Sequence, residues 1–334
     1  MVVPPVNAKT PPHITKISIR KENITMIWTM GEMIVEIMRD KVDQPLDKAG
    51  VFLGPYPSGA PAIFIDTAAR LGQKAGIISG VGCDDFGKNL LDRLNADGVD
   101  TSLVLQDPTC STGCAFVMYF SDGERKFIFH IGNTPAAKAK APETVPASDF
   151  FHVMGCSLMA SDVFGAEIVT TAKKFREAGA KISFDPNIRP ELMNGADTPK
   201  QILEMTSVFM PGVAELKMMA GCDTVEESVA KLFENPVLEI IALKRGSKGC
   251  TIYTRDADPL DFGIYPIVPV DATGAGASFD AAFLCGIIDG KSILEATRQA
   301  TSAASLNTAA FGPMEGKISP ETVAELIAAN PQVG

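Results

Sequence analysis

The seven residues Asp-Ala-Thr-Gly-Ala-Gly-Ala at 271–277, here called the glycine turn, constrain the fold more than any other segment. A strand-like apolar run at 262–270 precedes them, and a helix-like apolar run at 278–288 follows. A glycine-rich turn between a strand and a helix directs several backbone N–H groups at one point, where the helix dipole adds positive potential. Gly274 and Gly276 lack the Cβ atoms that would keep an anion away. The segment therefore predicts a phosphate-binding turn.

Strand-like and helix-like segments alternate over most of the chain. This alternation predicts an α/β fold, Rossmann-like, with a mostly parallel sheet between two layers of helices. We expect strands at 24–30, 74–79, 151–154, 181–185, 207–210 and 238–243, and helices at 62–71, 86–95 and 166–178.

Two stretches break this rhythm, at about 34–54 and 113–133, where apolar residues alternate with a period of two. The Asp122-Gly123 pair in the second stretch is typical of a hairpin turn. The two stretches predict a small antiparallel β-flap, or lid, built on the main domain. Residues 1–22 are rich in proline and predict a flexible extension, so the folded domain is expected at 23–330.

Composition argues against several classes of partner. The net charge is −10 and no basic cluster occurs, so neither nucleic acid nor an anionic membrane is an expected partner. No apolar run reaches the roughly 18 residues that span a bilayer, and the start lacks the apolar core of a signal peptide.

Among the seven cysteines only Cys110 and Cys114 are close, without a histidine nearby. Scattered reduced thiols in a cytoplasmic protein are the expectation.

The run Asp-Ala-Thr-Gly-Ala-Gly-Ala-Ser-Phe at 271–279 resembles the D-T-x-G-A-G-D-x-F signature of the ribokinase, or phosphofructokinase-B, family of carbohydrate kinases. The resemblance covers about residues 24–328, and Gly31-Glu32 and 129–133 look most like 2-keto-3-deoxygluconate and tagatose kinases. Further family motifs follow in the family's order at Ser58-Gly59, 69–72 (A-R-L-G), 82–87 (G-x-D-x-F-G), 98–101 (G-V-D-T), 185–189 (D-P-N-x-R), 211–215 (N-x-x-E, with Gly212 for Asn) and 246–249 (G-x-x-G).

The resemblance implies a ribokinase-like fold whose lid closes over a sugar. It also implies ATP and Mg²⁺ against the C-terminal half, K⁺ as an additional cation, and a homodimer formed through the lid. The transferred phosphate would rest on the amides of Gly274, Ala275 and Gly276, which can stabilise charge in the transition state.

Site residues carried over from the family fall into three groups. Sugar contacts are expected from Glu32, Ser58, Gly59, Phe129, Ile131 and Arg189. Nucleotide contacts are expected from Asn187, Lys244, Gly246, Ser247, Gly249, Gly274, Gly276, Ala303 and Asn307. Glu215 would orient water on Mg²⁺, and Asp271 and Thr273 would lie near the monovalent cation.

Several of these residues have a structural alternative. Glu215 can instead be the cap partner of a helix start, and Arg189 can form a surface ion pair. Ala303 and Asn307 can belong to the core, and His130 is expected to pack within the lid rather than to touch substrate.

Ala277 stands where the family signature has the Asp that takes the proton from the attacking hydroxyl. Loss of a general base typically costs about 10²–10⁴ in rate, so this chain is expected to be inactive or very slow. Asp280 lies one helical turn further on and is not expected to replace it. Two explanations stay open: a variant whose base was removed, or a natural relative that binds sugar without phosphorylating it. The otherwise intact motifs favour the first.

His130-Ile131 replaces the Tyr-Arg pair of keto-deoxy acid kinases, so a neutral ketose such as tagatose or fructose is the favoured substrate. An NAD-dependent oxidoreductase is the enzymatic rival, because Gly80-Val-Gly82 begins like a dinucleotide-binding motif. That motif lacks its last glycine, and no P-loop sequence occurs. A sugar sensor without activity is the rival of another class.

Overall fold

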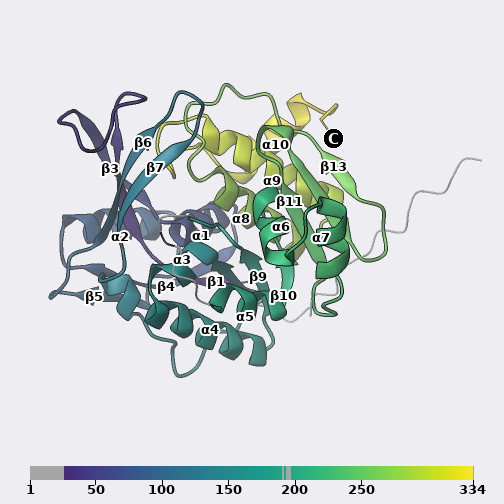
Figure 1. Cartoon of the computed structure of the whole chain (residues 1–334), viewed down its shortest axis with the longest axis horizontal. Coiled ribbons are helices and arrows are strands. Elements are labelled where there is room, and N and C mark those ends of the chain that lie inside the picture. Colours follow the sequence, from purple (N-terminus) through teal and green to yellow (C-terminus); the bar gives the residue numbers. More distant parts are fainter. Residues whose placement is uncertain (1–25, 190–191, 193–196, 334) are drawn as a thin grey trace, which may run out of the picture.

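The computed structural model describes residues 26–189, 192 and 197–333. The predicted flexible extension at 1–22 lies outside the described residues. Within them, a nine-stranded sheet lies between two layers of helices, and a four-stranded sheet stands beside it (Figure 1). The predicted three-layer α/β architecture with a smaller second sheet is confirmed.

The central sheet has the strand order β13-β12-β11-β10-β9-β8-β1-β4-β5. Pairing is parallel from β11 to β5, and the pairs β11–β12 and β12–β13 at one edge are antiparallel, so that β12 alone runs against the other strands of this sheet. Since parallel strands place their carboxyl ends at one edge, the loops that follow them gather there. The strands are β1 Met26–Met30, β4 Lys74–Gly82, β5 Val104–Asp107, β8 Phe150–Met154, β9 Lys181–Asp185, β10 Thr206–Phe209, β11 Ile240–Lys244, β12 Cys250–Thr254 and β13 Leu260–Phe262.

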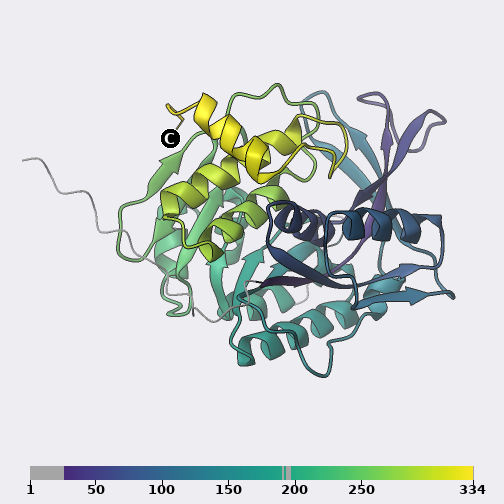
Figure 2. The same cartoon turned by 180° about the vertical axis from the view of Figure 1, so that it is seen from behind.

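Each face of the sheet has its own apolar core. One is shared with α1, α2, α8, α9 and α10, which lie toward the viewer in Figure 2. The other is shared with α4, α5, α6 and α7, which lie toward the viewer in Figure 1. The helices are α1 Ala60–Arg70, α2 Asp85–Ala96, α3 Gly155–Ala160, α4 Asp162–Glu177, α5 Thr198–Glu204, α6 Val213–Ala220, α7 Val225–Leu232, α8 Ala275–Ile288, α9 Ile293–Thr308 and α10 Pro320–Ala329.

The smaller sheet, hereafter the lid, consists of β3 Phe52–Ser58, β2 Ile34–Arg39, β6 Gly113–Tyr119 and β7 Arg125–His130 in that order. Strands β2, β6 and β7 lie in the two segments with period-two patterns, whereas β3 begins in the first segment and runs beyond its predicted end at 54. The pairs β3–β2 and β6–β7 are antiparallel as expected, but β2 and β6 are parallel. The reason is that β2 follows closely on β1 and β6 on β5, so both enter the lid from the main domain.

The run at 262–270 is not a strand, which corrects the sequence-based expectation. Strand β13 ends at Phe262, and no strand is assigned before α8. Pro266 and Pro269 lack the N–H that a sheet ladder needs, and Val268 is 84% exposed. Four side chains of this segment instead line a cavity described below, those of Ile264, Tyr265, Ile267 and Pro269.

Helix α8 follows the glycine turn and packs closely against α9. A Cβ placed at Gly286 of α8 would lie 2.8 Å from both the Cα and the Cβ of Ala296. Because protein interiors are packed to the density of organic crystals, this contact leaves no room for a side chain. No helix among the described residues is long and apolar enough to cross a membrane.

We expect Gly286→Val to lower the free energy of unfolding by about 1–3 kcal/mol, because the added side chain forces α8 away from α9. Denaturant unfolding measures this change. Gly263→Val is the matched control, since a Cβ there would meet nothing within 4 Å. Equal stability of the two variants would show that the helices separate without cost.

Candidate active site

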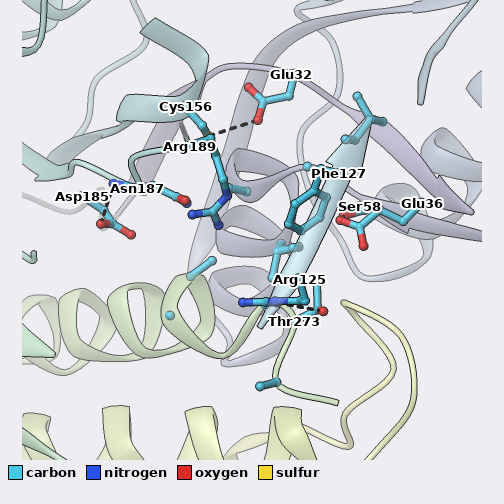
Figure 3. A pocket seen from close by; sticks show the side chains of 18 of the residues that line it. Glu32, Glu36, Ser58, Arg125, Phe127, Cys156, Asp185, Asn187, Arg189 and Thr273 are labelled. Atoms are coloured by element: carbon cyan, nitrogen blue, oxygen red, sulfur yellow. Dashed lines mark hydrogen bonds between the residues drawn. The ribbon is translucent and has the colours of Figure 1, made fainter. Parts of the chain in front are cut away.

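A cavity of about 310 Å³ lies between the lid, the carboxyl ends of the central strands and the start of α8 (Figure 3). It receives residues from β2 and β7 of the lid, from the segment after β9, and from the glycine turn. Segments far apart in the sequence therefore meet at this one place.

The glycine turn needs glycine at 274 for steric reasons. Gly274 is the N-cap of α8 with φ of 84°, and a Cβ there would lie 2.5 Å from the carbonyl oxygen of Pro313. A Cβ at Gly276 would meet nothing closer than the Lys244 Nζ at 3.7 Å, so the absent side chain leaves this end of the helix open. No side chain caps α8, and its first turn carries no acidic residue. The helix start can therefore accept an anion.

A buried charge cluster lies beside the turn. The Lys244 ammonium donates to Asp185 Oδ2 at 2.7 Å and to both oxygens of Asp280, at 3.2 and 3.0 Å. Burial raises the pKa of Asp280 well above its ordinary range. Burial alone would also raise the pKa of Asp185, but Lys244 and a hydrogen bond with Asp280 outweigh it and lower that pKa. Asp280 is completely buried and does not line the cavity, so it cannot take a proton from a substrate there.

Two buried carboxylates from the start of the lid face the cavity. Glu32 accepts hydrogen bonds from Cys156 Sγ at 3.3 Å and from the Ser157 hydroxyl. Glu36 Oε1 accepts from the Ser58 hydroxyl at 2.7 Å, while its buried Oε2 has no partner among the described residues. Burial raises the pKa of both groups, and that of Glu36 to about 7.

Strand β7 of the lid supplies the opposite wall. Arg125, Phe127 and Phe129 line the cavity from one face of the strand, and the two phenyl rings stack at 5.0 Å. The guanidinium groups of Arg125 and Arg189 each lie 6.0 Å from the centre of the Phe127 ring. Figure 3 shows both arginines near Phe127, with Arg125 beside Thr273. Acidic and guanidinium groups thus line the same cavity.

Glu215 lines the cavity and also caps α6. Its Oε1 accepts from the Ile188 N–H and its Oε2 from the Gly212 N–H, both at 2.7 Å. Glu215 is therefore the cap partner of a helix start, which was the structural alternative for it, although a free lone pair on each oxygen can still accept from a water.

Among residues 26–189, 192 and 197–333, no three histidine, cysteine or acidic side chains are grouped to hold a metal. A cation here would rely on phosphate and water ligands.

The two residues expected near a monovalent cation, Asp271 and Thr273, make several hydrogen bonds within and around the glycine turn. Asp271 Oδ1 accepts from the Thr273 N–H, and Oδ2 accepts from Tyr119 and from the Gly312 N–H. The Thr273 carbonyl accepts from Asn307 Nδ2 at 2.7 Å. The Asp271 side chain and the Thr273 carbonyl thus hold the turn together, while none of these contacts involves the Asp271 carbonyl, and the monovalent cation site stays a prediction.

A second cavity, of about 430 Å³, meets the first at Lys244, Gly246, Ala272 and Gly276. Its walls are mostly apolar and come from the segment after β13, from α8 and from α9. The remaining lining residues are Ser247, Gly249, Ile264, Tyr265, Ile267, Pro269, Ala275, Phe279, Thr301, Ala304, Ser305 and Thr308.

Most of the residues proposed from the sequence come together at these two cavities. Four do not line either one, and the first of them, Asp271, is held in the turn by its hydrogen bonds. Ala303 faces the core, while its neighbour Ala304 lines the second cavity. Asn307 holds the turn from behind, and Ile131 packs inside the lid with Ile34. The proposed residues that line the first cavity are Glu32, Ser58, Gly59, Phe129, Asn187, Arg189, Glu215, Lys244, Gly246, Thr273, Gly274, Gly276 and Ala277.

Sequence reasoning missed Glu36, Arg125, Phe127 and Asp185, all of which line the first cavity. A signal for two of them was present. Alternate residues of a strand share one face, so Phe129 on β7 implies Phe127 and Arg125 as companions. Asp185 opened a recognised motif, but its ion pair depends on Lys244, 59 residues away.

Residues 25–320 match the pfkB family of carbohydrate kinases, and the chain belongs to that family. It is 30% identical to the fructokinase of Solanum tuberosum over 275 residues, covering 81% of this chain and 83% of that protein. It is 31% identical to fructokinase-2 of Solanum lycopersicum over 279 residues, covering 81% and 84%.

Solved structures agree on the fold. A candidate ribokinase II from E. coli, solved in complex with ATP and Mg²⁺, matches with a TM-score of 0.84 at 36% identity, covering 92% of this chain and all of that one. Fructokinase from Vibrio cholerae O395, bound to fructose, ADP and calcium, matches with a TM-score of 0.76 at 22% identity, covering 91% and 99%. The second likeness supports the ribokinase-like fold alone.

The buried Glu36 generates a prediction on pH dependence. Its pKa rises from 4.5 to about 7 on folding, so between these values the folded protein holds a proton that the unfolded chain has lost. The free energy of unfolding therefore falls as pH rises through this range and levels off above it. Between about pH 5 and pH 8 the free energy of unfolding should fall less for Glu36→Gln than for the unaltered protein. We expect the two decreases to differ by on the order of 2–3 kcal/mol.

Urea unfolding at a series of pH values measures this difference. Glu124→Gln removes an exposed lid carboxylate and serves as the charge-matched control. If Glu36→Gln and the unaltered protein show the same pH dependence, the Glu36 side chain is already ionised when buried.

Proposed function

We propose that this chain is built to bind ATP with Mg²⁺ and a small neutral sugar, a ketose such as fructose or tagatose, for phosphoryl transfer to a hydroxymethyl group. The observation that carries the proposal is the meeting of two cavities at the open start of α8. One cavity is apolar and suits a nucleobase and ribose, and the other is polar and suits a sugar. The family and its fructokinase members point to the same chemistry.

The nucleotide would occupy the second cavity, with Ser247, Gly246 and Gly249 along its ribose and phosphates. The transferred phosphoryl group would rest on the first amides of α8, and Lys244 and Asn187 lie close enough to the turn to contribute. Mg²⁺ supplies charge neutralisation on the phosphates in such reactions, and Glu215 would hold it through water.

The sugar would lie in the first cavity against the lid. Glu32 and Glu36 accept hydrogen bonds and carry negative charge when ionised, so they suit hydroxyl donors and disfavour an anionic group at that end. Ser58 and Gly59 lie at the same end, where α1 begins. Because Arg125 and Arg189 line the same cavity, the preference for a neutral ketose over a keto-deoxy acid rests on Glu32 and Glu36 and not on the absence of a guanidinium.

The missing base is part of the proposal. Ala277 lies in the first turn of α8 and lines the first cavity, yet its methyl group accepts no proton. Asp280 is held by Lys244 away from the cavity. We therefore propose a kinase scaffold whose turnover is absent or very slow, and a sugar-binding protein without catalysis remains the alternative that Ala277 supports.

An NAD-dependent oxidoreductase is a weak rival. A Cβ at Gly80 would lie 2.3 Å from the Pro135 carbonyl oxygen, and one at Gly82 would lie 2.6 Å from that of Cys110. These glycines are thus explained by backbone packing rather than by a bound dinucleotide.

We place the protein in the cytoplasm, where ATP is available and its seven unpaired cysteines stay reduced.

Ala277→Asp should raise ATP-dependent phosphorylation of a ketose by about 10²–10⁴, since it supplies the proton acceptor that Ala277 lacks. ADP release measured over a panel of ketoses tests this. Ala277→Asn is the control, because its side chain has similar size without a basic oxygen. No turnover by Ala277→Asp with any ketose would contradict the assignment of position 277.

We also propose that the outer face of the lid pairs with a second copy of the chain. On β7 the residues alternate, so Ile128 and His130 face away from the cavity that Phe127 and Phe129 line. Ile128 lies opposite Phe116 on β6 and is 44% exposed. An apolar sheet face that no helix covers is typical of a protein interface.

Light scattering after size-exclusion chromatography should therefore show a dimer for the unaltered protein and a monomer for Ile128→Glu, because the new charge would be buried unpaired. Val163→Glu is the control, since Val163 is 67% exposed on α4, away from the lid. A monomeric unaltered protein would refute the interface.

A further inference from the structure

The lid contacts the glycine turn through two side chains of one hairpin. Tyr119 ends β6 and Arg125 begins β7, and the two residues face each other across the strands. The Tyr119 hydroxyl donates to Asp271 Oδ2 at 3.0 Å, and Arg125 Nη1 donates to Thr273 Oγ1 at 2.9 Å. The tip of the lid is therefore joined to the residues that directly precede Gly274.

Asp271 is a rigid partner for Tyr119. It is 3% exposed, and its two oxygens also accept from the Thr273 N–H at 2.9 Å and the Gly312 N–H at 3.1 Å. Burial raises the pKa of Tyr119, and the Asp271 charge raises it further, so the phenol keeps the proton that it donates. This contact fixes the hairpin tip relative to α8.

Arg125 has more hydrogen-bonding capacity than its partner uses. Its guanidinium has five N–H donors, yet within the described part of the chain its hydrogen bond is to the neutral hydroxyl of Thr273. No carboxylate forms an ion pair with it there, although its charge partly offsets the burial that raises the pKa of Glu36. It is half-buried and lines the first cavity next to the open start of α8. A hydrogen bond between two charged groups is roughly twice as strong as one between neutral groups, so a phosphate oxygen would be a better partner than Thr273.

We propose that Arg125 is a phosphate-contacting residue that the lid carries to the glycine turn, and that the Tyr119–Asp271 hydrogen bond positions it there. The inference rests on the proposed function of the turn. When a nucleoside triphosphate lies on the amides of α8, Arg125 exchanges the Thr273 hydroxyl for an oxygen of the terminal phosphate. The charge of the terminal phosphate is then fully neutralised only while the lid is closed and Arg125 lies beside it.

The same lid also contacts the sugar cavity through Glu36 and Phe127. A sugar bound there and a terminal phosphate bound to Arg125 would both stabilise the closed lid. Because such coupling between two sites is reciprocal, each ligand should tighten the binding of the other.

Calorimetry with the full chain tests the proposal, using the Mg²⁺ complexes of ADP and of a non-hydrolysable ATP analogue. Arg125→Gln should weaken binding of the ATP analogue by about tenfold or more, because a hydrogen bond to a charged group is lost. Binding of ADP, which lacks the terminal phosphate, should change little. Arg125→Lys should recover part of the loss, since it keeps the charge without the fork of donors.

Tyr119→Phe tests the positioning contact separately. Tyr119→Phe should weaken binding of the ATP analogue by a smaller factor than Arg125→Gln does, because Arg125 remains but is held less firmly. Binding of ADP should be unaffected. Lys126→Gln, an exposed cation next to Arg125 on β7, is the control that should alter neither ligand. Saturating fructose should tighten the ATP analogue by about fivefold or more in the unaltered protein and by less in Arg125→Gln.

The outcomes separate this inference from the function on which it rests. If neither nucleotide binds to the unaltered protein, the proposed function fails. If both bind and Arg125→Gln weakens them equally, or weakens neither, Arg125 does not contact the terminal phosphate and the inference is overturned while the proposed function stands.

Discussion

The close approach of Gly274 to the Pro313 carbonyl, with a backbone that only glycine adopts readily, is the constraint on which the rest of the site depends. It sets where α8 begins, and with it the direction of the first amides of that helix. Asn307 and Asp271 hold the same turn by hydrogen bonds to the Thr273 backbone. The turn is therefore fixed by the fold itself, which would lower the cost of binding the anion that we propose for it.

Charge around the turn is arranged in two layers. On one side of it, Lys244 contacts both Asp185 and Asp280, so the ammonium is fixed beside Gly276. On the other side, Arg125 of the lid donates a hydrogen bond to Thr273. A buried lysine with two acidic partners is costly to disturb, which makes the layer around Lys244 permanent and leaves the lid as the part that can change.

Ala277 gives this arrangement its unusual character. If the two cavities bind a nucleotide and a sugar as we propose, a site without a proton acceptor would hold both ligands together without consuming them. The nearest candidate by sequence, Asp280, is buried against Lys244. The same residue pair that strengthens the turn thus prevents Asp280 from replacing the missing base.

The amino-acid sequence by itself determined the layered α/β fold, the lid segments and the turn at Gly274, because these follow from local periodicity, hairpin residues and glycine spacing. It misassigned 262–270, where two prolines override apolar alternation, and it chose Ala303 where the helix turns Ala304 toward the cavity. Only the tertiary structure decided that Arg125 meets Thr273, that Tyr119 meets Asp271 and that Asn307 occupies the Thr273 carbonyl. The first two contacts join residues about 150 positions apart, and local sequence patterns carry no information on such pairings.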